Sequence, residues 1–235
     1  MKSFYSFVSN GEYGIGCTGQ SVCVFDKNGE ELVAFKDLKY AYSCAISPKG
    51  DIFVVKSTEG IVAVYSLADL RLIKKFRFSS VAESQDDNFC FSSDGEIFYN
   101  IERHGDSCKT ALSIYSTRDF VLNKRLFLAD TNMVLTSVEV DCTSGDVYMT
   151  GFYRKEKSGV AHKWFVAKLV DDVLRDFCYI LDSEHEYYVD YKKLEMSGFA
   201  EKSVKWSLFK DKQTELMEAK EKKISIAELW RKRSV

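Results

Sequence analysis

Two stretches of the sequence decide the fold: SPKGDIFVV at residues 47–55 and SSDGEIFYN at residues 92–100. In both, a polar turn ends in a glycine, an acidic residue follows, and an aliphatic–aromatic pair begins an apolar run. Glycine readily adopts the positive φ that a tight hairpin needs, so each stretch predicts a β-hairpin whose second strand starts at once. SNGEYGIG from Ser9 and TSGDVYMTG from Thr143 repeat the pattern, so the chain contains an internal repeat.

A second shared piece follows each of the first three hairpins. SVCVFD from Ser21, IVAVYS from Ile61 and ALSIYS from Ala111 are apolar runs that end in an aromatic and a small polar residue. A short polar turn and a fourth β-rich run come next in each unit. Four strands per unit at spacings of about 40 to 50 residues are typical of a propeller blade, and neighbouring blades must bury each other's faces.

The ends of the predicted third strands are Phe25-Asp26, Tyr65-Ser66 and Tyr115-Ser116. WD-repeat propellers often have Trp-Asp at this place, and with the turn glycines the chain resembles WD-repeat-like propellers over residues 3–181. It departs from them in lacking the Gly-His pair and in keeping the acid only at Asp26. The resemblance implies an architecture and no particular activity.

We therefore predict an all-β chain, a single propeller of about five four-stranded blades with a short C-terminal helix. The propeller would span residues 1–223 and the helical tail residues 224–235. The predicted blades are residues 3–36, 40–78, 86–128, 133–181 and 186–220. The last strand of the fifth blade, TELMEAK at 214–220, suits a helix as well as a strand, and a three-stranded blade would leave an open edge for the tail or a partner.

The tail carries the signature of a helix N-terminus. Ser225 and Glu228 fit a capping box, and Ile226, Leu229 and Trp230 form one apolar stripe. A helix this short is marginal alone in water, so the stripe is predicted to anchor the tail. The tail could dock on its own propeller or in a groove of another protein.

Composition excludes several classes of protein. The net charge is −2, no run of about 18 apolar residues exists, and the first residues lack the pattern of a signal peptide. We expect a cytoplasmic protein with neither a nucleic acid nor a membrane as its partner, either monomeric or homodimeric. The seven cysteines are odd in number and form no CxxC pair, which predicts free thiols.

Loop lengths point to a binding face. The loops between second and third strands grow from TGQ at 18–20 to RHGDSCK at 103–109 and RKEKSGVAHK at 154–163. In a propeller these loops share one face with the inter-blade loops, here residues 79–88 and 182–186. Long variable loops are typical of a binding face, although insertions are also tolerated at little cost. The candidate binding residues in or beside these loops are Tyr40, Asp86, Asp87, His104, Tyr153, Arg154, Lys155, Lys157, His162, Glu184, His185 and Tyr187.

Catalysis is not expected, because no constellation of reactive groups is recognisable. A glycoside hydrolase needs two converging carboxylates, and the first two inner strands contain none. The inner-strand acids are Asp86, Asp87, Glu139, Asp141, Glu186 and Asp190. The three histidines fall in predicted loops without metal-ligand spacing, so we expect neither a metal nor a cofactor. The sequence predicts a non-catalytic module that binds a protein or peptide; the alternative is carbohydrate or small-ligand binding, or glycoside-hydrolase-like activity, in the central pocket.

Overall fold

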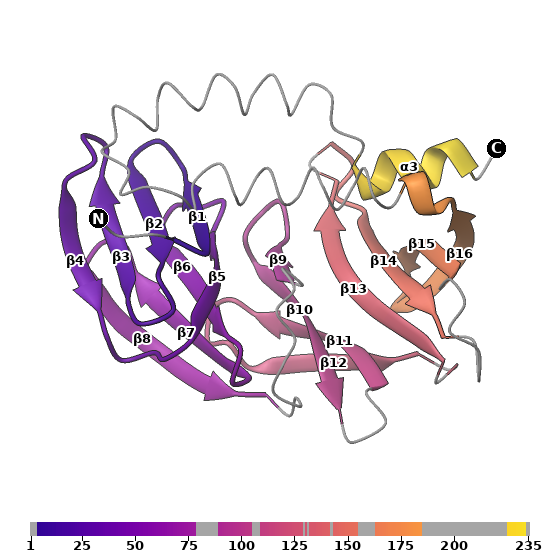
Figure 1. The fold of residues 1–235 in the computed structure, drawn as a ribbon, viewed down its shortest axis with the longest axis horizontal. Helices are drawn as coiled ribbons and strands as arrows, with labels where there is room; N and C mark the ends of the chain where they lie inside the picture. Colours follow the sequence, from indigo (N-terminus) through magenta and orange to yellow (C-terminus); the bar gives the residue numbers. More distant parts are fainter. Residues whose placement is uncertain are drawn as a thin grey trace. The chain divides into compact units, whose positions relative to one another are not determined.

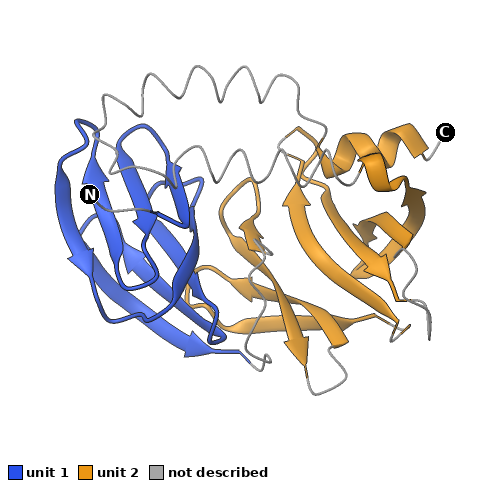
Figure 2. Cartoon of the chain, viewed as in Figure 1, with its two compact units in different colours: residues 1–78, 189–223 blue, residues 79–188, 224–235 orange. Residues whose placement is uncertain are grey.

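The computed structural model describes residues 4–78, 89–104, 109–128, 130, 132–141, 143–154, 163–184 and 225–233. The chain divides into two compact units, coloured blue and orange in Figure 2. Unit 1 comprises Met1–Phe78 and Val189–Lys223, and unit 2 comprises Ser79–Tyr188 and Ile224–Val235. Among the described residues, each unit contains two four-stranded antiparallel sheets.

The first sheet of unit 1 contains β1 (Ser6–Ser9), β2 (Tyr13–Cys17), β3 (Val22–Asp26) and β4 (Glu31–Phe35). The second contains β5 (Ala41–Ile46), β6 (Ile52–Ser57), β7 (Ile61–Ser66) and β8 (Arg71–Arg77). In each sheet the strands lie side by side in chain order, as Figure 1 shows.

Unit 2 repeats this organisation. Its first sheet contains β9 (Phe89–Phe91), β10 (Ile97–His104), β11 (Lys109–Ser116) and β12 (Leu122–Phe127). Its second contains β13 (Met133–Val140), β14 (Val147–Tyr153), β15 (Lys163–Val170) and β16 (Val173–Ile180). The helix α3 (Ile226–Arg233) follows near the C-terminus.

The predicted hairpin turns are confirmed. The four glycines of the repeated turn, Gly11, Gly50, Gly95 and Gly145, have φ of 93°, 71°, 70° and 75°. A residue with a Cβ rarely adopts this conformation, which is why glycine recurs at the same place in every sheet. Each glycine lies between the first and second strands of its sheet.

The aromatic–polar pairs that end the third strands have a structural role. Asp26 Oδ1 accepts hydrogen bonds from the backbone N–H groups two and four residues later, at 2.9 and 2.8 Å. Ser66 Oγ accepts one from the N–H three residues later, at 3.1 Å, and Ser116 Oγ one from the N–H two residues later, at 3.3 Å. The polar residue therefore orders the turn to the fourth strand, and a hydroxyl replaces the carboxylate in two sheets.

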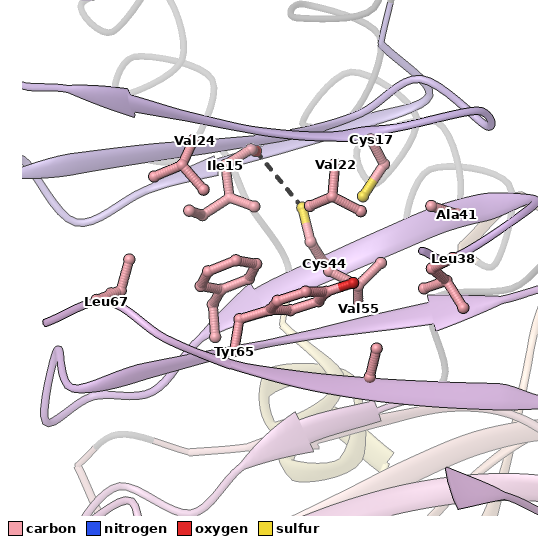
Figure 3. Packing of buried hydrophobic residues seen from close by; sticks show 12 residues of the cluster. Ile15, Cys17, Val22, Val24, Leu38, Ala41, Cys44, Val55, Tyr65 and Leu67 are labelled. Carbon is pink, nitrogen blue, oxygen red and sulfur yellow. Dashed lines mark hydrogen bonds between the residues drawn. The ribbon is translucent and has the colours of Figure 1, made fainter. Parts of the chain in front are cut away.

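The two sheets of unit 1 share a core, drawn in Figure 3. β5 packs against β1 and β2, so that the second sheet lies against the first. The rings of Phe53 and Tyr65 stack with centroids 4.8 Å apart, and Cys44 Sγ donates to the carbonyl of Ile15 at 3.5 Å. Since neither sheet could bury this surface alone, packing of consecutive sheets stabilises both.

Unit 2 is built in the same way, with β13 packed against β9, β10 and β11. Leu135, Val138 and Met149 of the later sheet join Ile101 and Leu112 of the earlier one in a single cluster. Each of these side chains is at most 5% exposed. The core therefore lies between consecutive sheets in both units.

The capping box predicted for the tail is confirmed. Ser225 Oγ accepts the backbone N–H of Glu228 at 3.1 Å, and Glu228 Oε2 accepts that of Ser225 at 2.7 Å. Ile226 and Leu229 are at most 1% exposed, whereas Trp230 is half-buried. The apolar stripe of α3 is therefore docked on the chain itself, against β14, β15 and β16.

α3 covers a defined face of the last described sheet. The Trp230 ring lies 5.6 Å from that of Tyr148, and its indole N–H donates to the carbonyl of Asp176 at 2.9 Å. Paired residues of adjacent strands point to the same face, and Tyr148 pairs with Glu139 and Lys168. Their chain neighbours, such as Val147, belong to the core shared with the preceding sheet. α3 thus lies on the opposite face, where a following blade would pack in a propeller.

The chain is all-β, with four-stranded propeller-type sheets and a short C-terminal helix, which confirms the predicted fold class. The predicted fifth blade at 186–220 lies outside the described residues. Within the described part of the chain, no helix is both long and apolar enough to span a membrane.

Two predicted loops are too long. Arg103 and His104 belong to β10 and Lys109 to β11, because their pairing continues through Arg103 with Thr110 and His104 with Lys109. The predicted loop at 154–163 also extends one residue too far, because Lys163 is the first residue of β15. The predicted inter-blade loop at 182–186 begins with helical residues at 182–184. Charged side chains at sheet ends reach solvent without leaving the strand, so polarity alone marks strand ends poorly.

Candidate functional site

The two sets of loops expected to share a face do so within unit 1. The N–H of Gly19, between β2 and β3, donates to the carbonyl of Ala41 at 3.0 Å. The N–H of Thr58, between β6 and β7, donates to the carbonyl of Tyr40 at 3.2 Å, and the Ser57 hydroxyl donates to that of Lys39 at 2.8 Å. The segment between the sheets is therefore held against both hairpin loops. We call this end of unit 1, residues 5, 18–21, 36–42 and 57–60, the linker end.

Two tyrosines stack at the linker end. The rings of Tyr5 and Tyr42 have centroids 5.4 Å apart and planes 25° apart. Tyr42 is the extra residue of a bulge in β5, between the paired residues Ala41 and Ser43, and bulges re-aim side chains. Gly19 lies beneath the Tyr5 ring, so closely that a Cβ there would meet ring carbon Cε2 at 3.0 Å. Although packed on two sides, Tyr5 remains 55% exposed.

Tyr40 adopts a strained backbone conformation in the hydrogen-bonded segment between the two sheets. Its φ is 55°, a region that costs a residue with a Cβ roughly 1–2 kcal/mol. Leu70 and Phe120 also have positive φ, but both side chains pack into apolar clusters. The Tyr40 side chain is 58% exposed, so its burial cannot offset the cost. Strain of this kind motivates a functional hypothesis.

Tyr5 and Tyr42 were not among the residues predicted from the sequence. The signal that could have found them is the dipeptide Tyr-Ser, which occurs near the start of the first strand of both sheets, at residues 5–6 and 42–43. Their stacking depends on β1 and β5 lying side by side, which one strand considered alone does not reveal.

In unit 2 as well, the segment before the second sheet meets the end of a second strand, where the loop to the third strand begins. The N–H of Arg154, after β14, donates to the carbonyl of Asn132, before β13, at 2.8 Å. Thr110 Oγ1 accepts the N–H of Leu135 at 2.8 Å and joins the two sheets at this end. Tyr153 and Arg154, both predicted binding residues, are half-buried here.

His104, predicted as a solvated loop histidine, is instead the last residue of β10. Its side chain is 16% exposed, and Nε2 lies 3.3 Å from Oε2 of Glu102. Its ring packs edge-on against Phe127, with centroids 5.3 Å apart. Burial and the nearby Arg125 lower the pKa of His104 below its usual 6.5, which Glu102 partly opposes.

The Glu102 carboxylate is the centre of a buried polar network in unit 2. It is 0% exposed, and Oε1 accepts hydrogen bonds from Tyr115 Oη at 2.6 Å and Asn100 Nδ2 at 3.1 Å. Oε2 accepts one from Arg125 at 2.8 Å. Burial and this carboxylate raise the pKa of Tyr115. The carboxylate accepts these three hydrogen bonds from side chains of β10, β11 and β12, so it joins three strands and is poorly suited to act as a base or ligand.

Glu184, another predicted binding residue, is engaged by the tail. Its Oε2 accepts the backbone N–H of Leu181 at 2.7 Å and a guanidinium N–H of Arg233 at 2.8 Å. Burial by itself would raise the pKa of Glu184. The contacts with Leu181 and Arg233 lower it by more than burial raises it, so the pKa lies below its usual value. The remaining predicted binding residues lie outside the described residues: Asp86, Asp87, Lys155, Lys157, His162, His185 and Tyr187.

The two described inner-strand acids are also committed to holding α3. Glu139 Oε2 accepts the N–H of Ile226 at 3.4 Å, and Asp141 pairs with Arg231. The N–H of Thr143 donates to Asp141 and, together with Arg231, keeps the pKa of that carboxyl below its usual value. Among the described residues, no group of three or more His, Cys, Asp and Glu side chains could hold a metal ion.

No protein-family model matches the sequence, and neither does any curated protein. Among solved structures, the chain is similar to hydrazine synthase of Kuenenia stuttgartiensis, with a TM-score of 0.60 and 14% identity, covering 73% of this chain and 51% of that one. It is also similar to the WD40 β-propeller domain of Doa1, with a TM-score of 0.44 and 12% identity, covering 61% and 45%. The chain thus spans about half the length of each. At 14% identity the first similarity concerns the fold alone, and it accords with the propeller-type sheets described above.

Proposed function

We propose that the chain is a non-catalytic interaction module that binds a protein or peptide, and that the linker end of unit 1 is its main contact surface. The observation that carries the proposal is the set of three tyrosines, Tyr5, Tyr40 and Tyr42, displayed on a hydrogen-bonded end of two packed sheets. Tyrosine is enriched at interface hot spots because it offers a large ring and a hydroxyl with few rotatable bonds.

The charges around the tyrosines support a protein partner. Lys36, Asp37 and Lys39 are exposed and Glu59 is partly exposed, so both signs occur together. A nucleic acid would require a more uniformly positive surface. Mixed charge is suited to selecting one protein surface over others.

The state of the described polar groups supports a function without catalysis. Glu102 is buried and accepts hydrogen bonds from Tyr115 and Arg125, and Glu139 and Asp141 hold α3. A general acid or base must reach a substrate atom, which these carboxylates are poorly placed to do. We further propose a reducing compartment such as the cytoplasm, consistent with five free cysteines among the described residues.

The test is partner capture from native lysate with the full-length chain as bait. Tyr5→Ala and Tyr40→Gly should each remove the specific partner, because they delete ring surface from the linker end. Lys27→Glu and Lys49→Glu are the controls, since both residues lie in turns at the other ends of these strands. The Tyr187→Ala variant and charge reversal at Lys155 and Lys157 test the contribution proposed for those residues.

The partner is then purified, and its binding to each variant is measured by sedimentation velocity. A partner lost only with the Lys27 and Lys49 variants would place binding at the opposite end of the strands. A partner retained by every variant would remove the linker end from the interface.

A further inference from the structure

The helix α3 is attached to unit 2 without being part of its framework. The strands β13–β16 pair among themselves into a four-stranded sheet. Among the described residues, the apolar cluster that joins this sheet to the preceding one contains no residue of α3. The helix instead buries Ile226, Ala227 and Leu229 on the opposite face, against β14, β15 and β16 (Figure 1). The described framework of unit 2 is therefore held together by contacts in which α3 takes no part.

The sheet nevertheless offers α3 a specific site for Trp230. Asp176 lies in a bulge of β16 with a φ of 54°, and its carbonyl accepts the indole N–H at 2.9 Å. The indole ring lies 5.6 Å from the ring of Tyr148, and Lys168 Nζ lies 5.7 Å from the centroid of each ring. A cation over two ring faces attracts both, so Lys168 favours the docked position of Trp230.

The charged side chains of α3 are held by ion pairs at the surface. Asp141 pairs with Arg231, whose side chain is 52% exposed. Glu184 pairs with Arg233, whose side chain is 37% exposed. Ion pairs of this kind contribute little to stability, because water and salt screen them. The site therefore recognises α3 by position and charge, while a short apolar stripe provides most of the attachment.

We propose that α3 is a releasable cover of unit 2, an intramolecular ligand that leaves the sheet as one unit while the four strands stay folded. Terminal elements with few buried apolar contacts are the parts of a protein that open locally. An eight-residue helix is marginal alone in water, so α3 loses its helical structure when it undocks. Docked α3 occupies the face on which a following blade would pack in a propeller, and it therefore controls access to that face.

The experiment uses a fluorescein-labelled peptide of residues 224–235, whose binding to the full-length chain is followed by fluorescence anisotropy. In the original chain the attached α3 competes with the peptide for the same site, and Trp230→Ala in the chain weakens this competitor. We expect the peptide to bind the Trp230→Ala chain at least tenfold more tightly than the original chain. A peptide that itself carries Trp230→Ala should bind neither chain. Lys232→Ala is the matched control, since Lys232 is an exposed residue of the same helix, and this chain should bind the peptide as weakly as the original.

Hydrogen exchange of the Trp230→Ala chain distinguishes release of α3 from unfolding of unit 2. The amides of α3 should exchange faster, while those of β14 and β15 keep their protection, because their pairing does not involve the helix. Loss of protection in these strands would make α3 part of the framework and overturn the proposal. Absence of peptide binding to the Trp230→Ala chain, or equally tight binding to the original chain, would also overturn it. Neither readout depends on the lysate partner, so the cover is tested separately from the interaction module at the linker end.

Discussion

Glu102 shows how a charge is accommodated in the interior of unit 2. A fully buried carboxylate is strongly destabilising unless charged and polar partners replace its water. Here Arg125 and Tyr115 provide the shortest contacts, at 2.8 and 2.6 Å, and both come from strands other than β10. The network therefore couples the stability of the sheet to a few side chains.

The first prediction tests this coupling. Arg125→Met should lower the free energy of unfolding by about 3 kcal/mol, because it leaves the Glu102 carboxylate buried without its cation. Urea denaturation monitored by circular dichroism measures the change. The control is Lys124→Met, since Lys124 pairs with Asp172 where both side chains are 49% exposed. Such a pair contributes only about 0–1 kcal/mol, so equal losses in the two variants would contradict a structural role for the network.

A second prediction at this scale concerns pH. The pKa of His104 is lowered in the folded chain, so the unfolded chain takes up a proton first as the pH falls. His104 therefore favours the folded state above its usual pKa of 6.5, and this contribution is lost as the pH falls through and below that value. His104→Gln should make the melting temperature fall less between pH 7 and 5. Parallel pH profiles of the two proteins would show that His104 is not the titrating group.

Among the elements, α3 differs most from the others, because it packs as a helix on the face of a sheet. Its capping box could be recognised from Ser225 and Glu228, since both hydrogen bonds are local. Its docking site could not be predicted, because Tyr148 and Glu139 are far from the helix in sequence. Only the register of β13 with β14 places these two residues on one face of the sheet. The predicted length of the β10–β11 loop failed for a related reason, since strand pairing continued through charged residues.

The third prediction concerns the packing of this helix. Leu229 is 1% exposed, so Leu229→Ala should reduce stability by about 2–5 kcal/mol through lost contacts and a cavity. Hydrogen exchange of the α3 amides should become faster, because the docked helix has little stability of its own. Lys232→Ala is the control, since Lys232 is exposed and its removal should change stability by less than about 0.5 kcal/mol. Unchanged exchange in Leu229→Ala would mean that the stripe does not hold the helix.

At the scale of the whole molecule, the chain gains its stability from packing of consecutive sheets within each unit. In unit 1 this packing buries Cys17 and Cys44, which are at most 6% exposed. Cys44 donates to a backbone carbonyl and lies 3.5 Å from the Ser6 hydroxyl. Cysteine here acts as a small apolar residue with a weakly polar thiol.

The fourth prediction follows from this use of cysteine. Thiol titration of the unfolded chain should give seven reactive groups with or without prior reduction, since the chain has seven cysteines and no disulfide is expected. Mass spectrometry after alkylation checks the count. A lower count without reductant would point to a disulfide and to an oxidising compartment.

The sequence by itself determined the features that a few neighbouring residues control. The turn glycines, the polar residues that cap the third-strand turns and the capping box at Ser225 each depend on local backbone conformation or on a short-range hydrogen bond. Such features recur in the sequence whenever the structure needs them, and the repeat therefore revealed the four-stranded sheets.

Only the tertiary structure decided which side chains meet. The stacking of Tyr5 on Tyr42, the closure of the network around Glu102 and the docking of α3 each join residues that are separated along the chain and belong to different elements or segments. Tyr40 appeared in the sequence as an exposed loop residue, but its positive φ became visible only in the backbone. The physical reason is that packing, burial and strain depend on distances in space, which the spacing of residues along a chain does not specify.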